Sequence, residues 1–199
     1  MKKIISSLML SVLICSSAYA ALEYEALSQN DAADYLAQQE IIKDHRSNPD
    51  DFRLPDSITR QETIKIIMKL SGLEILDTCN GVFSDVQDGW GCKYIEKALE
   101  QGYVASNDSF RPADNITKTE VAKLVLKVKD IEKVQVTDNW QEDYMKTLAY
   151  YGLIEDEYTD YNAPATRGWI FQIVTATLKK EPEIKKQIEK ETKLMSNEA

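Results

Sequence analysis

Three pairs of a threonine followed by a basic residue each stand just before a stretch with helical periodicity. The pairs are Thr59-Arg60, Thr117-Lys118 and Thr166-Arg167. A threonine in this place can cap a helix, and the first backbone N–H groups of a helix attract anions. Arginine can add a bidentate contact to a carboxylate or phosphate, and lysine a point charge. The pairs are therefore candidate anion sites, although the simpler interpretation of each is a cap followed by a solvated charge.

Aromatic residues recur at matching places ahead of two predicted helices. Trp90 and Tyr94 are followed exactly fifty residues later by Trp140 and Tyr144. Flat aromatic faces can stack on sugar rings, so Trp90 and Trp140 are candidate ligand contacts. Large aromatic residues at equivalent repeat positions are more often core residues, and we favour that interpretation here.

The N-terminal residues are typical of a secretory signal peptide. Lys2 and Lys3 precede a short apolar run, and small residues end it at Ala20, so cleavage is expected there. Loss of residues 1–20 would take the net charge from −9 to −11, because it removes two lysines and no acid. An acidic chain of this kind lacks the basic surface of a nucleic-acid-binding protein. The sequence predicts an exported protein of the periplasm, cell wall or cell surface, with no later membrane span.

Two cysteines remain after this cleavage, Cys79 and Cys92. In an oxidising compartment such a pair predicts a disulfide, which would hold the loop between them. A zinc site is the weaker alternative, because two cysteines and the single histidine, His45, cannot complete a tetrahedral set. No metal and no cofactor are expected.

Nothing in the sequence singles out an active site. With one histidine there is no evident Ser-His arrangement, and no pair of carboxylates stands out among many acids. Asp85 and Asp88 are interpreted as turn residues, because the loop lacks the spacing of an EF-hand. We therefore expect a protein that is not an enzyme.

The chain contains a repeated plan of helix, loop and helix. Apolar residues at i, i+3 and i+4 follow each threonine-basic pair, and no single unit could bury its own apolar stripe. Thr59 with Glu62 and Thr117 with Glu120 form predicted capping boxes, whereas Trp169 takes the place of the glutamate in the third unit. The first helices of the second and third units are expected to end at a left-handed Gly102 and Gly152, and Glu40 takes this place in the first unit.

The second unit resembles a complete S-layer homology repeat. The residues that carry the resemblance are Phe83-Ser84-Asp85-Val86, Trp90, Ile95, Ala98, Gly102-Tyr103-Val104, Phe110-Arg111-Pro112 and Ile116-Thr117-Lys118-Thr119-Glu120. The flanking units resemble the same repeat with parts missing, so we interpret the chain as three repeats, the first and third degenerate.

This resemblance implies an all-α fold with the three units in a pseudo-trimeric bundle. The predicted boundaries are 1–20 for the signal peptide, 21–30 for a lead-in, 31–78, 79–130 and 131–180 for the repeats, and 181–199 for a charged helical tail.

The resemblance also implies a function. Such domains hold exported proteins non-covalently to cell-wall polysaccharide, often through a pyruvylated sugar in the grooves between repeats. Arg60, Lys118 and Arg167 match the basic residue that grips the anionic group. The expected partner is an anionic wall polysaccharide or peptidoglycan. The alternative is an adaptor for another envelope protein, because the chain has no large passenger domain and the third unit has an acidic loop, Glu155-Asp156-Glu157 with Asp160.

Overall fold

The computed structural model describes residues 21–75, 77–86, 89–155 and 160–197. The predicted signal peptide and Asp88 lie outside these residues. The described chain forms six α-helices and one short 3₁₀ helix, and its β-structure is limited to isolated bridges. The helices are α1 (Gln29–Gln38), η1 (Pro49–Phe52), α2 (Arg60–Ser71), α3 (Cys92–Glu100), α4 (Lys118–Val128), α5 (Trp140–Tyr150) and α6 (Arg167–Asn197). The all-α prediction is confirmed.

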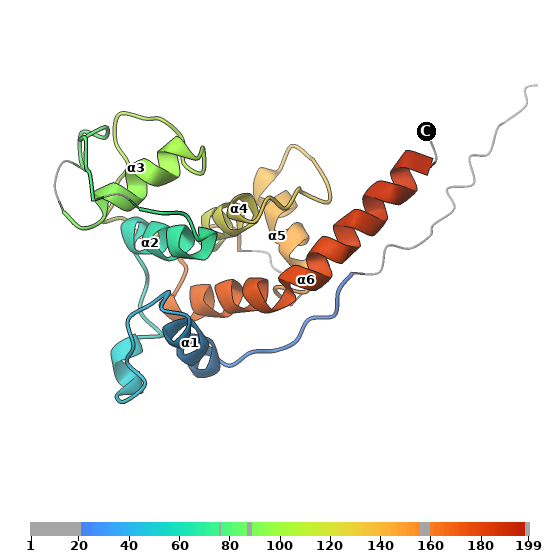
Figure 1. Cartoon of the computed structure of the whole chain (residues 1–199), viewed down its shortest axis with the longest axis horizontal. Helices are drawn as coiled ribbons and strands as arrows, with labels where there is room; N and C mark the ends of the chain where they lie inside the picture. The colour runs from blue at the N-terminus through green and yellow to red at the C-terminus, as the bar shows by residue number, and fades with distance from the viewer. Residues whose placement is uncertain (1–20, 76, 87–88, 156–159, 198–199) are drawn as a thin grey trace, which may run out of the picture.

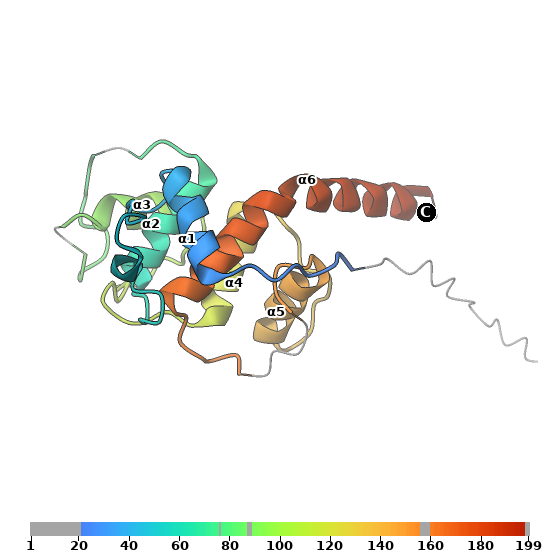
Figure 2. The same cartoon turned by 90° about the horizontal axis from the view of Figure 1, so that it is seen from below.

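The helices of each unit pack on helices of the neighbouring units (Figures 1 and 2). The second helix of one unit packs on the first helix of the next, so α2 contacts α3 and α4 contacts α5. The last helix, α6, packs on α1 and brings the C-terminal part of the chain back to the first unit. Because α4 also contacts α2 and α6, it lies at the centre of the molecule. The pseudo-trimeric symmetry of the bundle stays a prediction.

The loops before α2, α4 and α6 meet in a closed triangle of backbone hydrogen bonds. The N–H of Ile58 donates to the carbonyl of Ala165 at 3.2 Å, Ile116 donates to Ile58 at 3.2 Å, and Ala165 donates to Ile116 at 2.8 Å. All three residues are buried. The starts of the three helices are therefore fixed beside one another, which places Arg60, Lys118 and Arg167 at related positions.

The predicted helix signals are present. Both capping boxes form, and in the third unit the N–H of Trp169 donates to Thr166 Oγ1 at 3.2 Å. Gly102 and Gly152 have φ values of 71° and 61°. Glu40 adopts the same left-handed conformation with φ 57°, which costs an L-residue about 1 kcal/mol.

Helix α6 continues through Pro182 to Asn197, so the second helix predicted for the third unit and the predicted charged tail form one helix. The first part of the tail is not solvated on all sides, because Ile184 is buried against the core. Lys129 pairs with Glu181 at 2.8 Å, and the hydroxyl of Tyr150 donates to Glu191 at 2.5 Å. None of the described helices has the length and apolar composition of a membrane span.

The predicted disulfide between Cys79 and Cys92 is confirmed, with the two Cα atoms 5.6 Å apart. It ties the loop before α3 to the first residue of that helix. Glu96 supports the same loop, because its carboxylate accepts from the N–H groups of Asn80 and Val82. With both sulfurs bonded to each other, the zinc alternative has no thiolate ligands.

Candidate functional site

Arg60, the first residue of α2, reaches across to the second unit. Its Nε donates to the carbonyl of Phe110 at 3.0 Å, and its Nη1 pairs with Glu120 at 2.8 Å. The guanidinium also lies over the ring of Phe110, 4.9 Å from the centroid. Arg60 thus joins two units, and Nη2 is the group of its guanidinium that no contact among the described residues uses.

Arg167 makes the same set of contacts from α6 to the first unit. Its Nε donates to the carbonyl of Phe52 at 2.8 Å, and its Nη1 pairs with Glu62 at 3.2 Å. Lys118 follows the pattern with a different partner, because the third unit has Trp169 in place of the glutamate. The Nζ of Lys118 lies 5.4 Å from the centre of the Trp169 ring. We call these three contacts the inter-unit locks.

Backbone hydrogen bonds between the units contradict one part of the expected anion site. We expected uncompensated N–H groups beside each basic residue, and this is wrong because carbonyls of the neighbouring unit accept from them. The pairs are Arg60 to Asp114 at 2.8 Å, Gln61 to Pro112 at 3.1 Å, Lys118 to Ala163 at 3.0 Å, Arg167 to Asp56 at 2.9 Å, and Gly168 to Leu54 at 2.8 Å. Thr59, Thr117 and Thr166 serve as caps. An anion would therefore be held by side chains.

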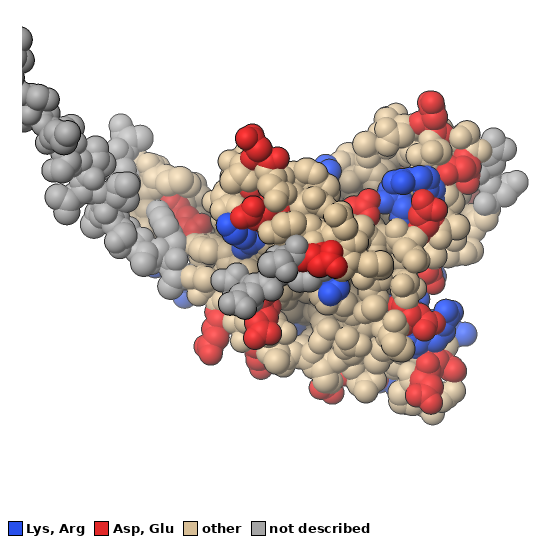
Figure 3. Space-filling view, turned by 180° about the vertical axis from the view of Figure 1, so that it is seen from behind, with Lys and Arg blue, Asp and Glu red and all other residues tan. Residues whose placement is uncertain are grey.

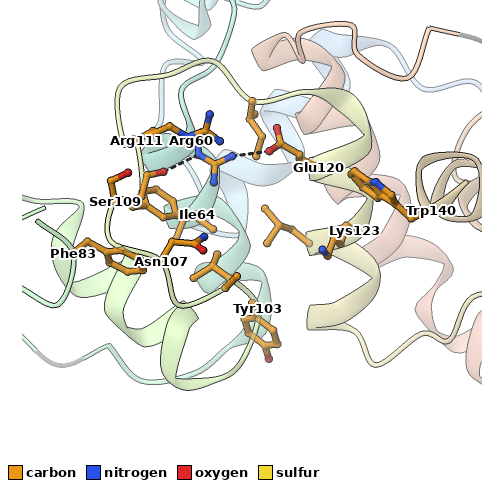
Figure 4. Close-up of a pocket in the computed structure, with 15 residues that line it drawn as sticks. Arg60, Ile64, Phe83, Tyr103, Asn107, Ser109, Arg111, Glu120, Lys123 and Trp140 are labelled. Carbon is orange, nitrogen blue, oxygen red and sulfur yellow. Dashed lines mark hydrogen bonds and ion pairs between the residues drawn. The ribbon is translucent and has the colours of Figure 1, made fainter. Parts of the chain in front are cut away.

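A cavity of about 290 Å³ lies between the first and second units, and we call it the first groove (Figure 4). Three cations line it from three segments: Arg60 from α2, Arg111 from the loop before α4, and Lys123 from α4. Trp140 closes one side, next to Lys123. The remaining residues on its walls are Ile64, Phe83, Tyr103, Val104, Ala105, Asn107, Ser109, Phe110, Ile116, Glu120 and Leu124.

Trp90 and Trp140 are not core residues, so our preferred interpretation of them was wrong. Their exposed fractions are 48% and 43%. Each stands at or near the start of a first helix, where a lysine of the neighbouring second helix covers its ring. Lys65 lies 5.2 Å from the Trp90 centroid and Lys123 lies 5.4 Å from that of Trp140. Trp140 lines the first groove, and Trp90 is at the equivalent place one unit earlier.

Burial lowers the pKa of Lys123, and the charge of nearby Lys127 acts in the same direction. An anion in the groove would offset both effects. Glu120, which also lines the groove, acts on the pKa of Lys123 in the opposite direction.

Arg111 owes its position to Asp85. The carboxylate of Asp85 accepts from the N–H groups of Phe110 at 2.8 Å and Arg111 at 2.7 Å, while Arg111 adopts a left-handed φ of 61°. Burial alone would raise the pKa of Asp85, but these backbone donors outweigh it and the pKa is lowered. The interpretation of Asp85 as a turn residue is confirmed. With its side chain 61% exposed, Arg111 is the most accessible of the three cations.

A buried carboxylate holds the loop that leads to Trp140. Asp143 is fully covered, and it accepts from the N–H of Thr137 at 3.1 Å, from the Thr137 hydroxyl at 2.8 Å and from Lys133 at 2.9 Å. Burial raises the pKa of Asp143, but these donors outweigh it and lower the pKa to about 2.

This lowered pKa predicts a pH-dependent stability. The carboxylate of Asp143 stabilises the fold above the ordinary pKa of 3.8, and this contribution is lost as pH falls through about 2. We expect Asp143→Asn to lower the melting temperature at pH 6 and the difference from the wild type to shrink toward pH 2. The control is Asp138→Asn, an exposed position in the same loop. A difference that stays constant with pH would contradict the assignment.

The sequence named Arg60 and Trp140 among the candidate ligand contacts, with a core position preferred for Trp140, and it did not single out Lys123 or Arg111 as candidates. A signal for Lys123 was available, because Lys65 and Lys123 each stand six residues after a cap threonine. Arg111 carried no such signal, since its role depends on a turn held by a distant carboxylate.

The equivalent cavity one unit further along is the second groove, with a volume of about 230 Å³. It contains Lys118 and Trp169, together with Gln172 at the position of Lys123. The three basic residues therefore do not share one site: Arg60 lines the first groove, Lys118 lines the second, and Arg167 lies in the contact between the third and first units.

These features define a helical module with grooves between neighbouring pairs of helices. Residues 82–122 match the model of the S-layer homology domain. No curated protein matches the chain. The match to residues 82–122 supports an S-layer homology domain over these residues, and such domains are binding modules of the cell envelope. The matched residues include the disulfide-bonded Cys92, Asp85, Arg111 and the cap of α4.

Proposed function

We propose that the protein attaches non-covalently to the cell wall by holding an anionic segment of wall polysaccharide or peptidoglycan in the first groove, and that it has no catalytic activity. The observation that supports this most is the convergence of Arg60, Arg111 and Lys123 with the half-exposed ring of Trp140 in one cavity. Cations recognise a carboxylate or phosphate, and an aromatic face recognises the apolar face of a sugar.

The residues that line the groove fall into two groups, which would contact different parts of the ligand. Arg111 and the Nη2 of Arg60 would hold the acidic group. Asn107 and Ser109 offer polar groups for sugar hydroxyls, and Trp140 offers a stacking surface. Lys123 stands beside the tryptophan and would hold a second negative charge or a hydroxyl.

The three cations of the first groove contrast with the negative net charge of the whole molecule. The chain has a net charge of −9, and on the face shown in Figure 3 the basic side chains form small groups among acidic ones. A general attraction to polyanions is therefore not expected, and binding should depend on this local set of cations. High salt should weaken it, because exposed Arg111 is screened.

Retention on purified cell-wall sacculi tests the proposal. We expect Lys123→Ala/Trp140→Ala to reduce retention about tenfold or more, since it removes a cation and the stacking surface together, and tenfold corresponds to about 1.4 kcal/mol. The matched variant is Lys65→Ala/Trp90→Ala, which removes the equivalent stack outside the first groove and should be retained like the wild type.

Two outcomes would overturn the assignment. Equal losses in both variants would show that the first groove is not the binding site. Absence of wild-type retention would remove the wall-binding function itself. If the wild type is retained, its retention on sacculi stripped of attached polysaccharide, with the peptidoglycan intact, would show which of the two polymer classes it binds.

A protein partner is the second candidate function. It is favoured by the end of α6, which projects beyond the bundle and carries the exposed Met195 (Figure 1). Cross-linking in intact cells to one defined envelope protein, without retention on sacculi, would support this candidate.

A further inference from the structure

The two disulfide-bonded cysteines lie beside one carboxylate. The Sγ atoms of Cys79 and Cys92 and a carboxylate oxygen of Glu96 all lie within 4.8 Å of one another, and among the described residues this is the one such group of three metal-ligating side chains. It lies at the start of α3, at the end of the molecule opposite the C-terminus of α6 (Figure 1). Thiolates and carboxylates are both zinc ligands in proteins. The group therefore has the composition of a metal site in any molecule whose two sulfurs are not bonded to each other.

The spacing of these atoms suits a tetrahedral ion. Zn–S bonds of about 2.3 Å and Zn–O bonds of about 2.1 Å place a sulfur and an oxygen ligand about 3.6 Å apart, and two sulfur ligands about 3.8 Å apart. The Sγ of Cys92 lies 3.6 Å from Oε1 of Glu96, which is the separation that a shared ion requires. The two sulfurs must move apart once the bond between them is absent, and Cys79 lies in an exposed loop that permits this movement.

The same loop holds Glu96 in position. The carboxylate accepts from the N–H groups of Asn80 at 2.9 Å and Val82 at 3.1 Å, and from the side-chain amide of Asn80 at 3.0 Å. Burial raises the pKa of Glu96, but these donors outweigh it and the pKa is lowered, so the group is an anion at neutral pH. Hydrogen bonds behind a metal ligand fix its orientation. Glu96 is thus oriented toward the sulfurs before any ion arrives.

We propose that the dithiol form of this loop binds one Zn²⁺ ion through Cys79, Cys92 and Glu96, and that formation of the disulfide expels the ion. A newly exported chain has both thiols, because disulfides form in the oxidising compartment. Soft thiolate ligands favour zinc over Mg²⁺ and Ca²⁺, and water fills the fourth position of the tetrahedron. The sequence gave no indication of this set, because it offered only the two cysteines and His45 as ligands.

Metal binding and disulfide formation exclude each other because they use the same two sulfur atoms. One thiolate attacks an oxidising disulfide such as glutathione disulfide and releases one glutathione thiolate, and the second cysteine then displaces the other. Two electrons pass from the cysteines to the glutathione disulfide, and Zn²⁺ leaves with its charge unchanged. Each state closes the same loop, so the entry to α3 is held both before and after oxidation.

Titration of the reduced protein with Zn²⁺ or Co²⁺ alone tests the proposal. The chain begins at Ala21, so that Cys79 and Cys92 are its only cysteines. The reductant is a phosphine, because a dithiol would itself bind the metal. We expect one ion per chain and, for Co²⁺, the charge-transfer absorbance of thiolate ligands. The disulfide form and Cys79→Ser/Cys92→Ala should bind neither ion. No binding by the reduced wild type, or equal binding by these two controls, would overturn the proposal.

Glu96→Gln tests the third ligand. Loss of a group that only supports a metal ligand weakens binding about 10–100-fold, so loss of the ligand itself should weaken Zn²⁺ binding at least about tenfold. The matched control is Glu100→Gln, one turn further along α3, whose carboxylate pairs with Lys97 and lies outside the group. Equal affinities of the two variants would show that Glu96 is not a ligand.

Glu96→His distinguishes a ligand from a residue that only positions the loop. Glutamine keeps an oxygen that can accept from the loop, whereas histidine supplies a nitrogen that can bind zinc. A ligand role therefore predicts tighter Zn²⁺ binding by Glu96→His than by Glu96→Gln. The reverse order, in variants whose circular dichroism matches that of the wild type, would show that Glu96 acts only on the loop.

Oxidation of the zinc-loaded protein tests the exclusion. Glutathione disulfide should release one Zn²⁺ per chain, measured with a chromogenic chelator, as the two thiols disappear. Retention of the ion after the disulfide has formed would overturn this part of the proposal. None of these measurements involves the first groove or a saccharide, so failure of the metal site and failure of the proposed function are distinguishable.

Discussion

Loss of the disulfide is expected to lower the free energy of unfolding by about 3 kcal/mol. The bond closes a loop with a sequence separation of 13, and a loop of this size loses about that much chain entropy when it is cross-linked in the unfolded state. Cys79→Ser/Cys92→Ala suits the two environments, because Cys79 is exposed and Cys92 is buried. Urea unfolding of the wild type and the variant measures the difference.

A reducing agent supplies the control for this prediction. Dithiothreitol should destabilise the wild type by a similar amount and leave the double variant unchanged. A wild type that is insensitive to reduction would show that Glu96, which holds Asn80 and Val82, is sufficient to keep the loop in place.

Truncation of the inter-unit locks should have the second large effect. Arg60→Ala leaves Glu120 and the carbonyl of Phe110 without their partner in a partly buried contact, and we expect a loss of about 2 kcal/mol. Arg167→Ala should cost a similar amount, since Glu62 and Phe52 take the same parts.

Lys118→Ala is the matched comparison, because Lys118 occupies the same helix position with Trp169 as its neighbour. A cation–π contact of this kind contributes less, about 0.5–1 kcal/mol. Urea unfolding should therefore rank the two arginine variants together and the lysine variant above them in stability. Equal stabilities for all three would contradict the role of the glutamates.

The locks change how a binding experiment should be designed. Arg60 is 16% exposed and joins two units, so a loss of wall binding in Arg60→Ala would mix a lost ligand contact with a loosened groove. Lys123 and Trp140 lie outside the locks. Their variants report on the ligand site with less disturbance of the fold.

Local features of the fold were predictable from the sequence. Capping boxes at Thr59 and Thr117 and left-handed ends at Gly102 and Gly152 depend on nearby residues, and all four are present. The sequence did not predict which helices of neighbouring units pack on each other. An apolar stripe indicates that a helix must be covered, but it carries no information on which neighbour covers it.

The same limit applies to the site. The basic residue after each cap was found by its spacing, but the occupation of its N–H groups depends on loops that lie about fifty residues or more away in sequence. Trp140 was misinterpreted as a core residue because hydrophobicity predicts burial on average. Its place at the edge of a groove is set by the packing of α5 on α4.

Trp140 emission tests most directly whether the first groove holds an anionic sugar. In protein with Trp90→Phe and Trp169→Phe, titration with a pyruvylated monosaccharide should change this emission saturably, with one site for each chain. Lys123→Ala in the same background should weaken binding about tenfold. Retention of the protein on sacculi, together with no change in Trp140 emission at any sugar concentration, would contradict the claim and place the binding site elsewhere.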